Sequence, residues 1–138
     1  MKARIQLVEG MTFVAESGSG HAIVVDGSPD VGGRDLGARP MELVLLGLGT
    51  CSAIDVVHIL RKARQEISGC VVELDSDRAA QAPKVFTRIH MHYVVTGRAL
   101  APTQVERAIR LSKEKYCSAT AMLAKTAAIS VDFEIRET

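Results

Sequence analysis

The 138-residue chain contains no tryptophan, only two tyrosines and three phenylalanines, and it carries a formal charge of only +1. Seventeen basic residues are balanced by sixteen acidic ones, so little excess positive charge is available to attract a phosphate backbone. The shortage of aromatic side chains also leaves few surfaces on which nucleobases could stack. The composition therefore predicts no nucleic-acid partner.

No long apolar stretch follows Met1, so no secretory signal peptide is indicated and we expect a cytoplasmic protein. Three cysteines, Cys51, Cys70 and Cys117, are an odd number and argue against a disulfide scaffold in that compartment. Their spacing matches no zinc motif, and we expect neither a metal nor another cofactor. Any cysteine function is then redox or nucleophilic.

Two further patterns have ordinary structural interpretations. His90 and His92 share one face of a predicted strand, but no third ligand with useful spacing follows, which favours a partly solvated outer face over a metal site. The four glycines within residues 27–39 do not open a helix at phosphate-loop spacing, and no Gly-Lys-Ser/Thr occurs. Residues 27–39 are therefore predicted to be a loop.

The alternation of apolar and polar residues predicts most of the strands. Three short strands are expected within the first 26 residues, with a tight turn at Glu9-Gly10. Two more are expected over "VVELDSD" and "VFTRIHMHYVV", and a last one over "ISVDFEIRE".

Helices are expected between these strands. The first should begin at Pro40 and continue to about residue 67, where Ser68-Gly69 ends it. A second should begin near Pro102 or Thr103, and a short third should begin at Ser118, whose hydroxyl is a suitable N-cap. The order βββ-α-ββ-αα-β predicts one α+β domain over residues 1–138, with a largely antiparallel sheet packed on a long central helix.

The first helix is apolar almost all the way round between residues 41 and 60, which is typical of a helix that is buried on every side. Glu42, Asp55 and His58 interrupt this run and argue against a membrane span. A single domain of this size cannot cover such a helix, so a second copy of the chain is the natural cover. We therefore expect a homodimer.

Cys51, Asp55 and His58 follow one another at i, i+4 and i+7 and so lie on one stripe of that helix. His58 is about 10 Å along the axis from Cys51, too far for a direct thiol–imidazole pair, and the Asp55 carboxylate would raise the pKa of the thiol. This segment alone favours a buried, inert cysteine.

Cys117 changes that balance. It precedes a predicted helix start and is flanked by Lys113 and Lys115, and both features favour a thiolate. Cys70 has no charged neighbour and is interpreted as structural. Cys51 and Cys117 could be a peroxide-reactive cysteine and its resolving partner, although spacing alone does not show that they meet.

Three segments carry a family resemblance, namely "PMELVLLGLGTCSAIDVV" (40–57), "APKVFTRIHMHYVVTG" (82–97) and "SKEKYCSATAML" (112–123). The chain resembles the OsmC/Ohr family of peroxide-defence proteins over essentially its whole length, and especially the YhfA-like branch. The resemblance implies an intertwined homodimer with two long central helices. It also implies that Cys51 attacks an organic hydroperoxide, that Cys117 resolves the sulfenic acid as a disulfide, and that a dithiol of a lipoyl or thioredoxin-like protein reduces it.

The family pairs an arginine with a glutamate placed directly after the helix proline, and this chain departs from that pattern. Met41 occupies the glutamate position and Glu42 follows it, while Arg39 is one of the nearby cations. Glu42 and Arg39 are therefore the candidate partners of the Cys51 thiolate. Two alternatives to a peroxidase stay open: a non-enzymatic redox sensor or small hydrophobic-ligand binder, and a thiol hydrolase or transferase with a base from the other subunit.

Overall fold

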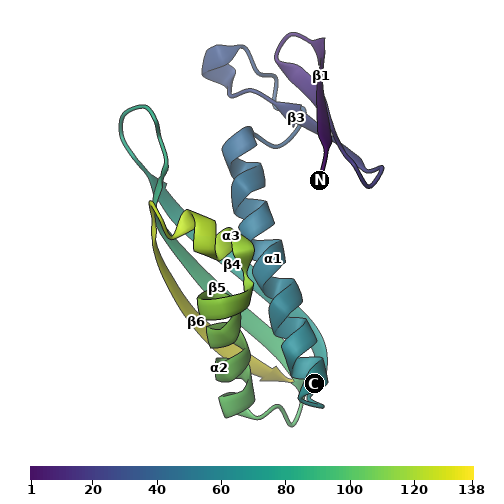
Figure 1. Ribbon diagram of the computed structural model, residues 1–138, viewed down its shortest axis with the longest axis vertical. Helices are drawn as coiled ribbons and strands as arrows, with labels where there is room; N and C mark the ends of the chain where they lie inside the picture. The colour runs from purple at the N-terminus through teal and green to yellow at the C-terminus, as the bar shows by residue number, and fades with distance from the viewer. The chain divides into compact units, whose positions relative to one another are not determined.

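The computed structural model describes all residues from 1 to 138, and the chain divides into two compact units, residues 1–46 and 47–138. The predicted order βββ-α-ββ-αα-β is confirmed (Figure 1). The strands form two separate three-stranded sheets, where the sequence suggested one. The assignment of residues 1–138 to one domain stays a prediction.

The first unit contains the predicted meander. Strands β1 (Ala3–Glu9), β2 (Thr12–Ser17) and β3 (Ala22–Asp26) pair antiparallel in chain order. The turn between β1 and β2 places Gly10 at a φ of +56°, in the left-handed region that glycine adopts most readily. The predicted Glu9-Gly10 turn therefore depends on the missing side chain.

The glycine-rich segment that follows β3 is organised around one buried carboxylate. Asp26 accepts hydrogen bonds from the backbone N–H groups of Gly27, Arg34 and Leu36, at 2.9, 3.0 and 3.2 Å. These bonds lower the pKa of Asp26, and the bond from the backbone N–H of Arg34 has the largest effect. The segment contains only a single 3₁₀ turn, Pro29–Val31, as expected of a loop.

The second unit contains the larger sheet, formed by β4 (Glu66–Arg78), β5 (Phe86–Arg98) and β6 (Ala128–Glu137). β4 and β5 are antiparallel, whereas β5 and β6 are parallel. Over both sheets, three of the four strand pairings are antiparallel, as expected, and only the β5–β6 pairing departs from the expectation. Helices α2 (Pro102–Leu111) and α3 (Ser118–Leu123) form the crossover that a parallel pair of strands requires.

The helices cover one face of this sheet (Figure 1). His90 and His92 lie on the other face, where both rings contact the Asp132 carboxylate and remain partly exposed, as predicted. The alternate residues of β5 are fully buried and form the centre of the core: Ile89, Met91, Tyr93 and Val95.

Helix α1 (Pro40–Lys62) begins at the predicted proline but ends five residues before the predicted boundary. Arg64 adopts a left-handed φ of +56° and donates its N–H to Arg61 O, and Gln65 N–H donates to Leu60 O. This bond pair is a Schellman motif, which glycine usually closes. Here arginine closes the motif, so no glycine marks the end of the helix. The prediction therefore relied on the next glycine, Gly69, which lies inside β4.

By length and composition α1 could cross a membrane, and only 28% of its most apolar stretch is buried within one chain. Within the second unit it lies close to the sheet. A Cβ added at Gly49 would be 2.8 Å from Leu74 Cδ1. Four side chains of α1 are fully buried, namely those of Leu48, Ser52, Val56 and Leu60.

A tight contact at the end of β5 gives a first prediction. A Cβ at Gly97 would lie 2.3 Å from the backbone oxygen of Glu66, so Gly97→Ala should lower the free energy of unfolding by about 1–3 kcal/mol. Gly69→Ala is the matched control, because its Cβ would meet only the side chain of Thr96, with Cβ at 3.4 Å and Oγ1 at 3.6 Å. Urea denaturation of both variants measures the difference, and equal unfolding midpoints would contradict the prediction.

Candidate functional site

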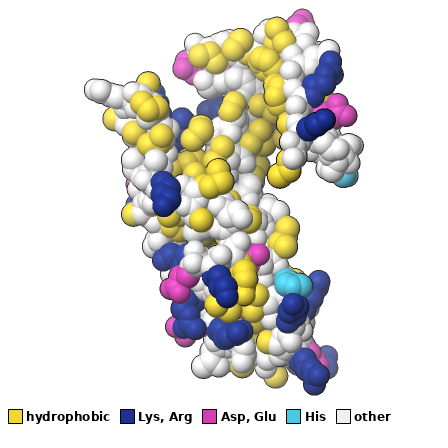
Figure 2. All heavy atoms as spheres, in the orientation of Figure 1, with side chains coloured by type: hydrophobic (Ala, Val, Ile, Leu, Met, Phe, Trp, Pro, Cys, Tyr) yellow, Lys and Arg dark blue, Asp and Glu magenta, His cyan; other side chains and the backbone are white.

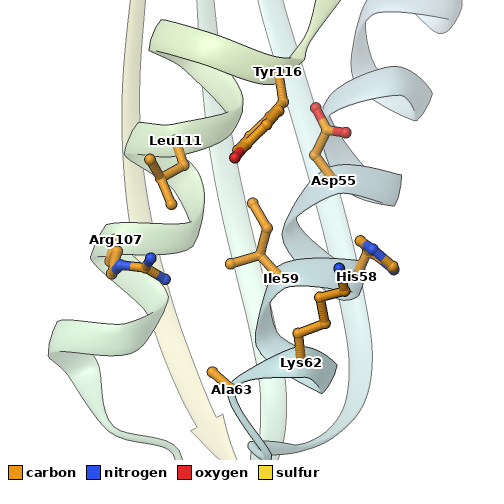
Figure 3. A pocket seen from close by; sticks show the side chains of 8 residues that line it. All are labelled: Asp55, His58, Ile59, Lys62, Ala63, Arg107, Leu111 and Tyr116. Carbon is orange, nitrogen blue, oxygen red and sulfur yellow. The ribbon is translucent and has the colours of Figure 1, made fainter.

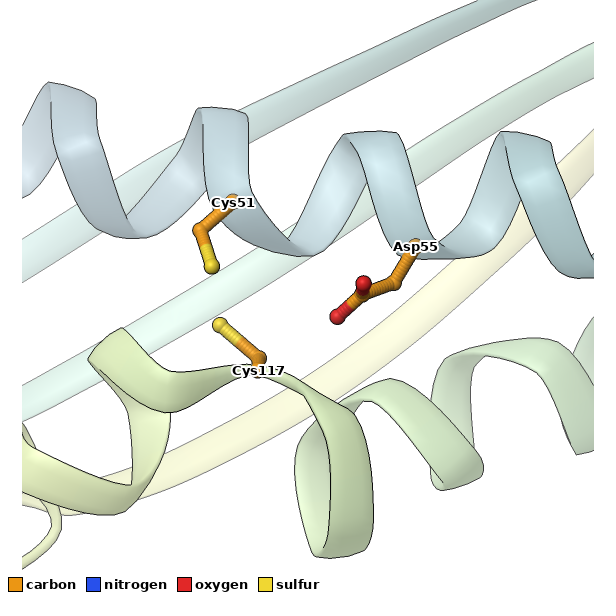
Figure 4. A group of neighbouring side chains, drawn as sticks. All are labelled: Cys51, Asp55 and Cys117. Atoms are coloured by element: carbon orange, nitrogen blue, oxygen red, sulfur yellow. The ribbon is translucent and has the colours of Figure 1, made fainter.

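Two cysteines from distant parts of the chain meet in the second unit. Cys51 lies on α1, and Cys117 lies between a π-helical turn, Ser112–Tyr116, and α3. Their sulfurs and a carboxylate oxygen of Asp55 are all within 4.8 Å of one another. Figure 4 shows both thiols directed into the same gap, with Asp55 approaching from the next turn of α1. Neither cysteine is in a disulfide.

Cys117 is held as the N-cap of α3. Its sulfur accepts the N–H of Thr120 at 3.4 Å, so the cap is Cys117 and not the predicted Ser118. The thiol is only 3% exposed, and burial raises its pKa. Hydrogen bonds with Thr120 oppose this rise, and the neighbouring Cys51 adds to it. The expectation that this position favours a thiolate is wrong, because burial outweighs the helix start.

The Asp55 carboxylate is held by a chain of hydroxyl groups. Ser112 Oγ donates to Asp55 Oδ2 at 3.0 Å, and Ser52 Oγ lies 2.9 Å from Ser112 Oγ. Tyr93 Oη lies 2.5 Å from Ser52 Oγ. Since the one proton of Ser112 is directed to Asp55, Ser52 donates to Ser112 and Tyr93 donates to Ser52. Burial raises the pKa of Tyr93 to about 12, which keeps this donor neutral.

The π-helical turn brings two members of the site into position. Because the turn is wider than an α-helical one, Cys117 N–H donates to Ser112 O at 2.9 Å, and the turn ends with Cys117 beside α1. The sequence placed Asp55 one turn after Cys51 but gave it only an unfavourable effect on the thiol. The i, i+4 spacing from Cys51 was the sequence signal that could have identified Asp55 as a site residue. No sequence signal indicated Ser112.

A cavity of about 520 Å³ lies between α1 and α2 and shares Asp55 with the cysteine cluster. Figure 2 shows hydrophobic side chains in this hollow, with basic and histidine side chains around it. In Figure 3, Tyr116 and Arg107 enter from the α2 side, and Ile59 projects from α1 between them. The cavity thus combines apolar walls with cationic groups, and its lining is Asp55, His58, Ile59, Lys62, Ala63, Arg107, Leu111 and Tyr116.

The other two predicted site residues, Arg39 and Glu42, belong to the first unit. Glu42 Oε1 accepts a hydrogen bond from the backbone N–H of Arg39 at 2.8 Å. One oxygen of this carboxylate is therefore engaged at the start of α1. The guanidinium of Arg34 reaches Glu9 at 3.7 Å and Thr12 at 3.4 Å. Roles for Arg39 and Glu42 beside Cys51 stay predictions.

Cys70 lies apart from the cluster, on β4. Burial raises the pKa of its thiol. It lines a separate hollow, together with Ile54 and other residues of α1. The structural role of Cys70 stays a prediction, and its place outside the cluster makes it a control for experiments on the other two cysteines.

Comparison with known proteins gives one consistent family. The model of the OsmC-like protein family matches residues 32–133. Protein YhfA of Escherichia coli K12 is 49% identical over 135 residues, which cover 98% of each chain. The crystal structure of a hypothetical protein from Aquifex aeolicus VF5 has a TM-score of 0.87 at 31% identity and covers 99% of this chain and 96% of that one.

A more distant structure carries a functional description. An organic hydroperoxide resistance protein OsmC from Legionella pneumophila, described as a predicted redox protein, has a TM-score of 0.70 at 13% identity. The alignment covers 96% of this chain and 95% of that one. At this identity the likeness shows a shared fold.

Proposed function

Because this chain belongs to the OsmC-like family, we propose that it is a thiol-dependent peroxidase that reduces organic hydroperoxides through Cys51 and Cys117. The observation that carries the proposal is the convergence of two free cysteines and one carboxylate, whose sulfur and oxygen atoms lie within 4.8 Å of one another. A distant protein whose description names organic hydroperoxide resistance shares this fold.

Exposure divides the roles between the two cysteines. Cys117 is 3% exposed, whereas Cys51 is half-buried and is therefore the thiol that a peroxide meets first. The Cys51 thiolate attacks the terminal, hydroxyl-bearing oxygen of the peroxide, the O–O bond breaks, and the alkoxide takes a proton and leaves as an alcohol. Cys51 is then a sulfenic acid.

Cys117 completes the cycle. After the Cys117 thiol has lost its proton to solvent, its sulfur attacks the sulfenic sulfur, an S–S bond forms, and the hydroxyl group of the sulfenic acid leaves with a proton from solvent as water. The overall reaction consumes one hydroperoxide and two thiols and gives an alcohol, water and a disulfide. A dithiol from a lipoyl or thioredoxin-like protein restores both thiols by exchange, which suits a reducing, cytoplasmic location.

Asp55 is the group positioned to carry the proton of the Cys51 step. Its carboxylate lies within 4.8 Å of both sulfurs and is oriented by Ser112. It can accept the proton of the Cys51 thiol and return it to the departing alkoxide, which is general acid–base catalysis. Glu42 and Arg39 stay the predicted partners of the Cys51 thiolate, which is a different role from this proton transfer.

The adjoining cavity supports an organic substrate. Ile59 and Leu111 give it apolar walls, and Asp55, whose carboxylate lies within 4.8 Å of both sulfurs, also lines it. An alkyl or aryl group can lie against the apolar side chains while the peroxide group is directed to Cys51.

We propose that the protein works as a homodimer in which α1 is buried between subunits. Large apolar side chains of α1 are exposed in one chain, with Val44 at 40%, Leu46 at 58% and Ile54 at 63%. Exposed apolar surface of this kind marks a contact with another protein surface. Polar groups on the same helix, Asp55 and His58, favour protein over lipid as that cover.

The test is a stoichiometric assay. Reduced protein should convert cumene hydroperoxide or tert-butyl hydroperoxide into the alcohol, and a dithiol such as dihydrolipoamide should sustain further turnovers. The alternative function is a hydrophobic-ligand binder, and the cavity is the observation that supports it. It predicts saturable binding of the alcohol or peroxide with no loss of thiols, and that result would overturn the peroxidase.

The raised pKa of Cys117 gives a prediction for pH dependence. Because burial keeps this thiol protonated at neutral pH, the rate of disulfide closure should rise by up to about tenfold per pH unit between about pH 6 and about pH 8. Rapid mixing of the reduced protein with excess peroxide separates closure from sulfenic acid formation, which a sulfenic-acid trap reports. A closure rate that does not change with pH would show that the proton of Cys117 does not limit the step.

A further inference from the structure

We propose that the reduced Cys51–Asp55–Cys117 cluster is a binding site for Zn²⁺, with two sulfur ligands and one carboxylate ligand. Zinc binding does not depend on the proposed peroxidase function. Its expected consequence, inhibition of peroxide reduction, rests on that function. The spacing of the cysteines along the chain matches no zinc motif, so only the fold reveals this site.

The ligand geometry fits a tetrahedral ion. Zinc lies about 2.3 Å from thiolate sulfur and about 2.0–2.2 Å from carboxylate oxygen, so ligand atoms around it are about 3.5–3.8 Å apart. The three ligand atoms here are already within 4.8 Å of one another, and a closing shift of at most about 1.3 Å brings them to that spacing. Figure 4 shows all three side chains directed into one gap.

The surroundings of the ligands also resemble those of a metal site. The Asp55 carboxylate is oriented by the hydroxyl of Ser112, which Ser52 and Tyr93 hold in turn. Hydrogen bonds of this kind to a ligating carboxylate are typical of protein metal sites. Two sulfur ligands select zinc over the oxygen-preferring cations magnesium and calcium.

The fourth position is open toward solvent. Asp55 also lines the 520 Å³ cavity, so water can reach the ion from that side. On binding, each thiol releases a proton to solvent and forms a sulfur–zinc bond, with no change in oxidation state. Because the same two sulfurs form the disulfide, a bound ion and peroxide reduction exclude each other, and zinc would protect the thiols from oxidation.

The test is a titration of reduced, metal-free protein with Zn²⁺, and with Co²⁺ as a spectroscopic probe. One ion per chain should bind, and cobalt should show thiolate charge-transfer bands and the visible bands of a tetrahedral site. Cys51→Ser and Cys117→Ser each remove one of the two sulfur ligands. Neither variant should therefore show the cobalt charge-transfer bands of a site with two thiolates. Asp55→Asn should weaken zinc binding by about tenfold or more, and Cys70→Ser should leave it unchanged.

Two readouts keep the test independent of variant folding and of the peroxidase. In the wild-type protein, zinc should protect Cys51 and Cys117, but not Cys70, from alkylation, and the protein carrying a Cys51–Cys117 disulfide should not bind. Absence of stoichiometric binding, or binding that survives loss of either cysteine or is unchanged in Asp55→Asn, would overturn the site. Peroxide reduction by metal-free protein is measured separately, so either proposal can fail alone.

Discussion

Cys51→Ser is expected to lower the turnover of organic hydroperoxides by about a thousandfold or more, because the serine hydroxyl is a far weaker nucleophile at neutral pH. Cys117→Ser should still react once with peroxide, but no partner thiol then traps the sulfenic acid. Cys51 should therefore proceed to sulfinic acid under excess peroxide, and turnover should stop. Alcohol production and the mass of the oxidised protein measure the two effects.

Cys70→Ser is the control for both variants. Cys70 lies outside the cluster, so its replacement should leave turnover and over-oxidation unchanged. Wild-type activity in Cys51→Ser would exclude Cys51 as the attacking thiol. If Cys117→Ser cycled at the wild-type rate without over-oxidation, another thiol would have to resolve Cys51.

The second large effect concerns assembly. Wild-type protein should sediment as a dimer at micromolar concentration, and Ile54→Asp should weaken the dimer by about a hundredfold or more, because it would bury an unpaired carboxylate in the subunit contact. Ile54 is 63% exposed in one chain, so the substitution should not unfold the monomer. Sedimentation velocity measures the oligomeric state, and circular dichroism confirms the fold.

Thr103→Asp is a matched control for that variant. Thr103 is exposed in the first turn of α2, where a carboxylate is favourable. It should leave the dimer intact. A wild-type protein that sediments at the 14.8 kDa of one chain would contradict the proposed assembly.

The long helix shows where the sequence was informative and where it was not. Its start was predictable, because Pro40 begins an apolar run that no further proline interrupts. Its end was not, because Arg64 adopts the left-handed conformation that usually indicates glycine. The parallel pairing of β6 was also missed, because apolar alternation identifies a strand but not its neighbour or direction.

The candidate site divides in the same way. The cysteine pair was predicted from the family resemblance, and the fold brings Cys51 and Cys117 together. The electrostatic prediction for Cys117 was wrong, because Lys113 and Lys115 are visible in the sequence whereas the burial of the thiol is not. The contact of Ser112 with Asp55 depends on the π-helical turn, which no sequence pattern indicated.

The proposed chemistry depends on direct bonding between the two sulfurs after peroxide attack. The decisive measurement is mass spectrometry of peptides from reduced, metal-free protein that has been treated with one equivalent of cumene hydroperoxide and then alkylated. We expect a Cys51–Cys117 disulfide as the main product, with Cys70 alkylated in full. Recovery of Cys51 as a free, alkylated thiol from the folded protein at neutral pH would contradict the peroxidase and make Cys51 an inert residue of the helix.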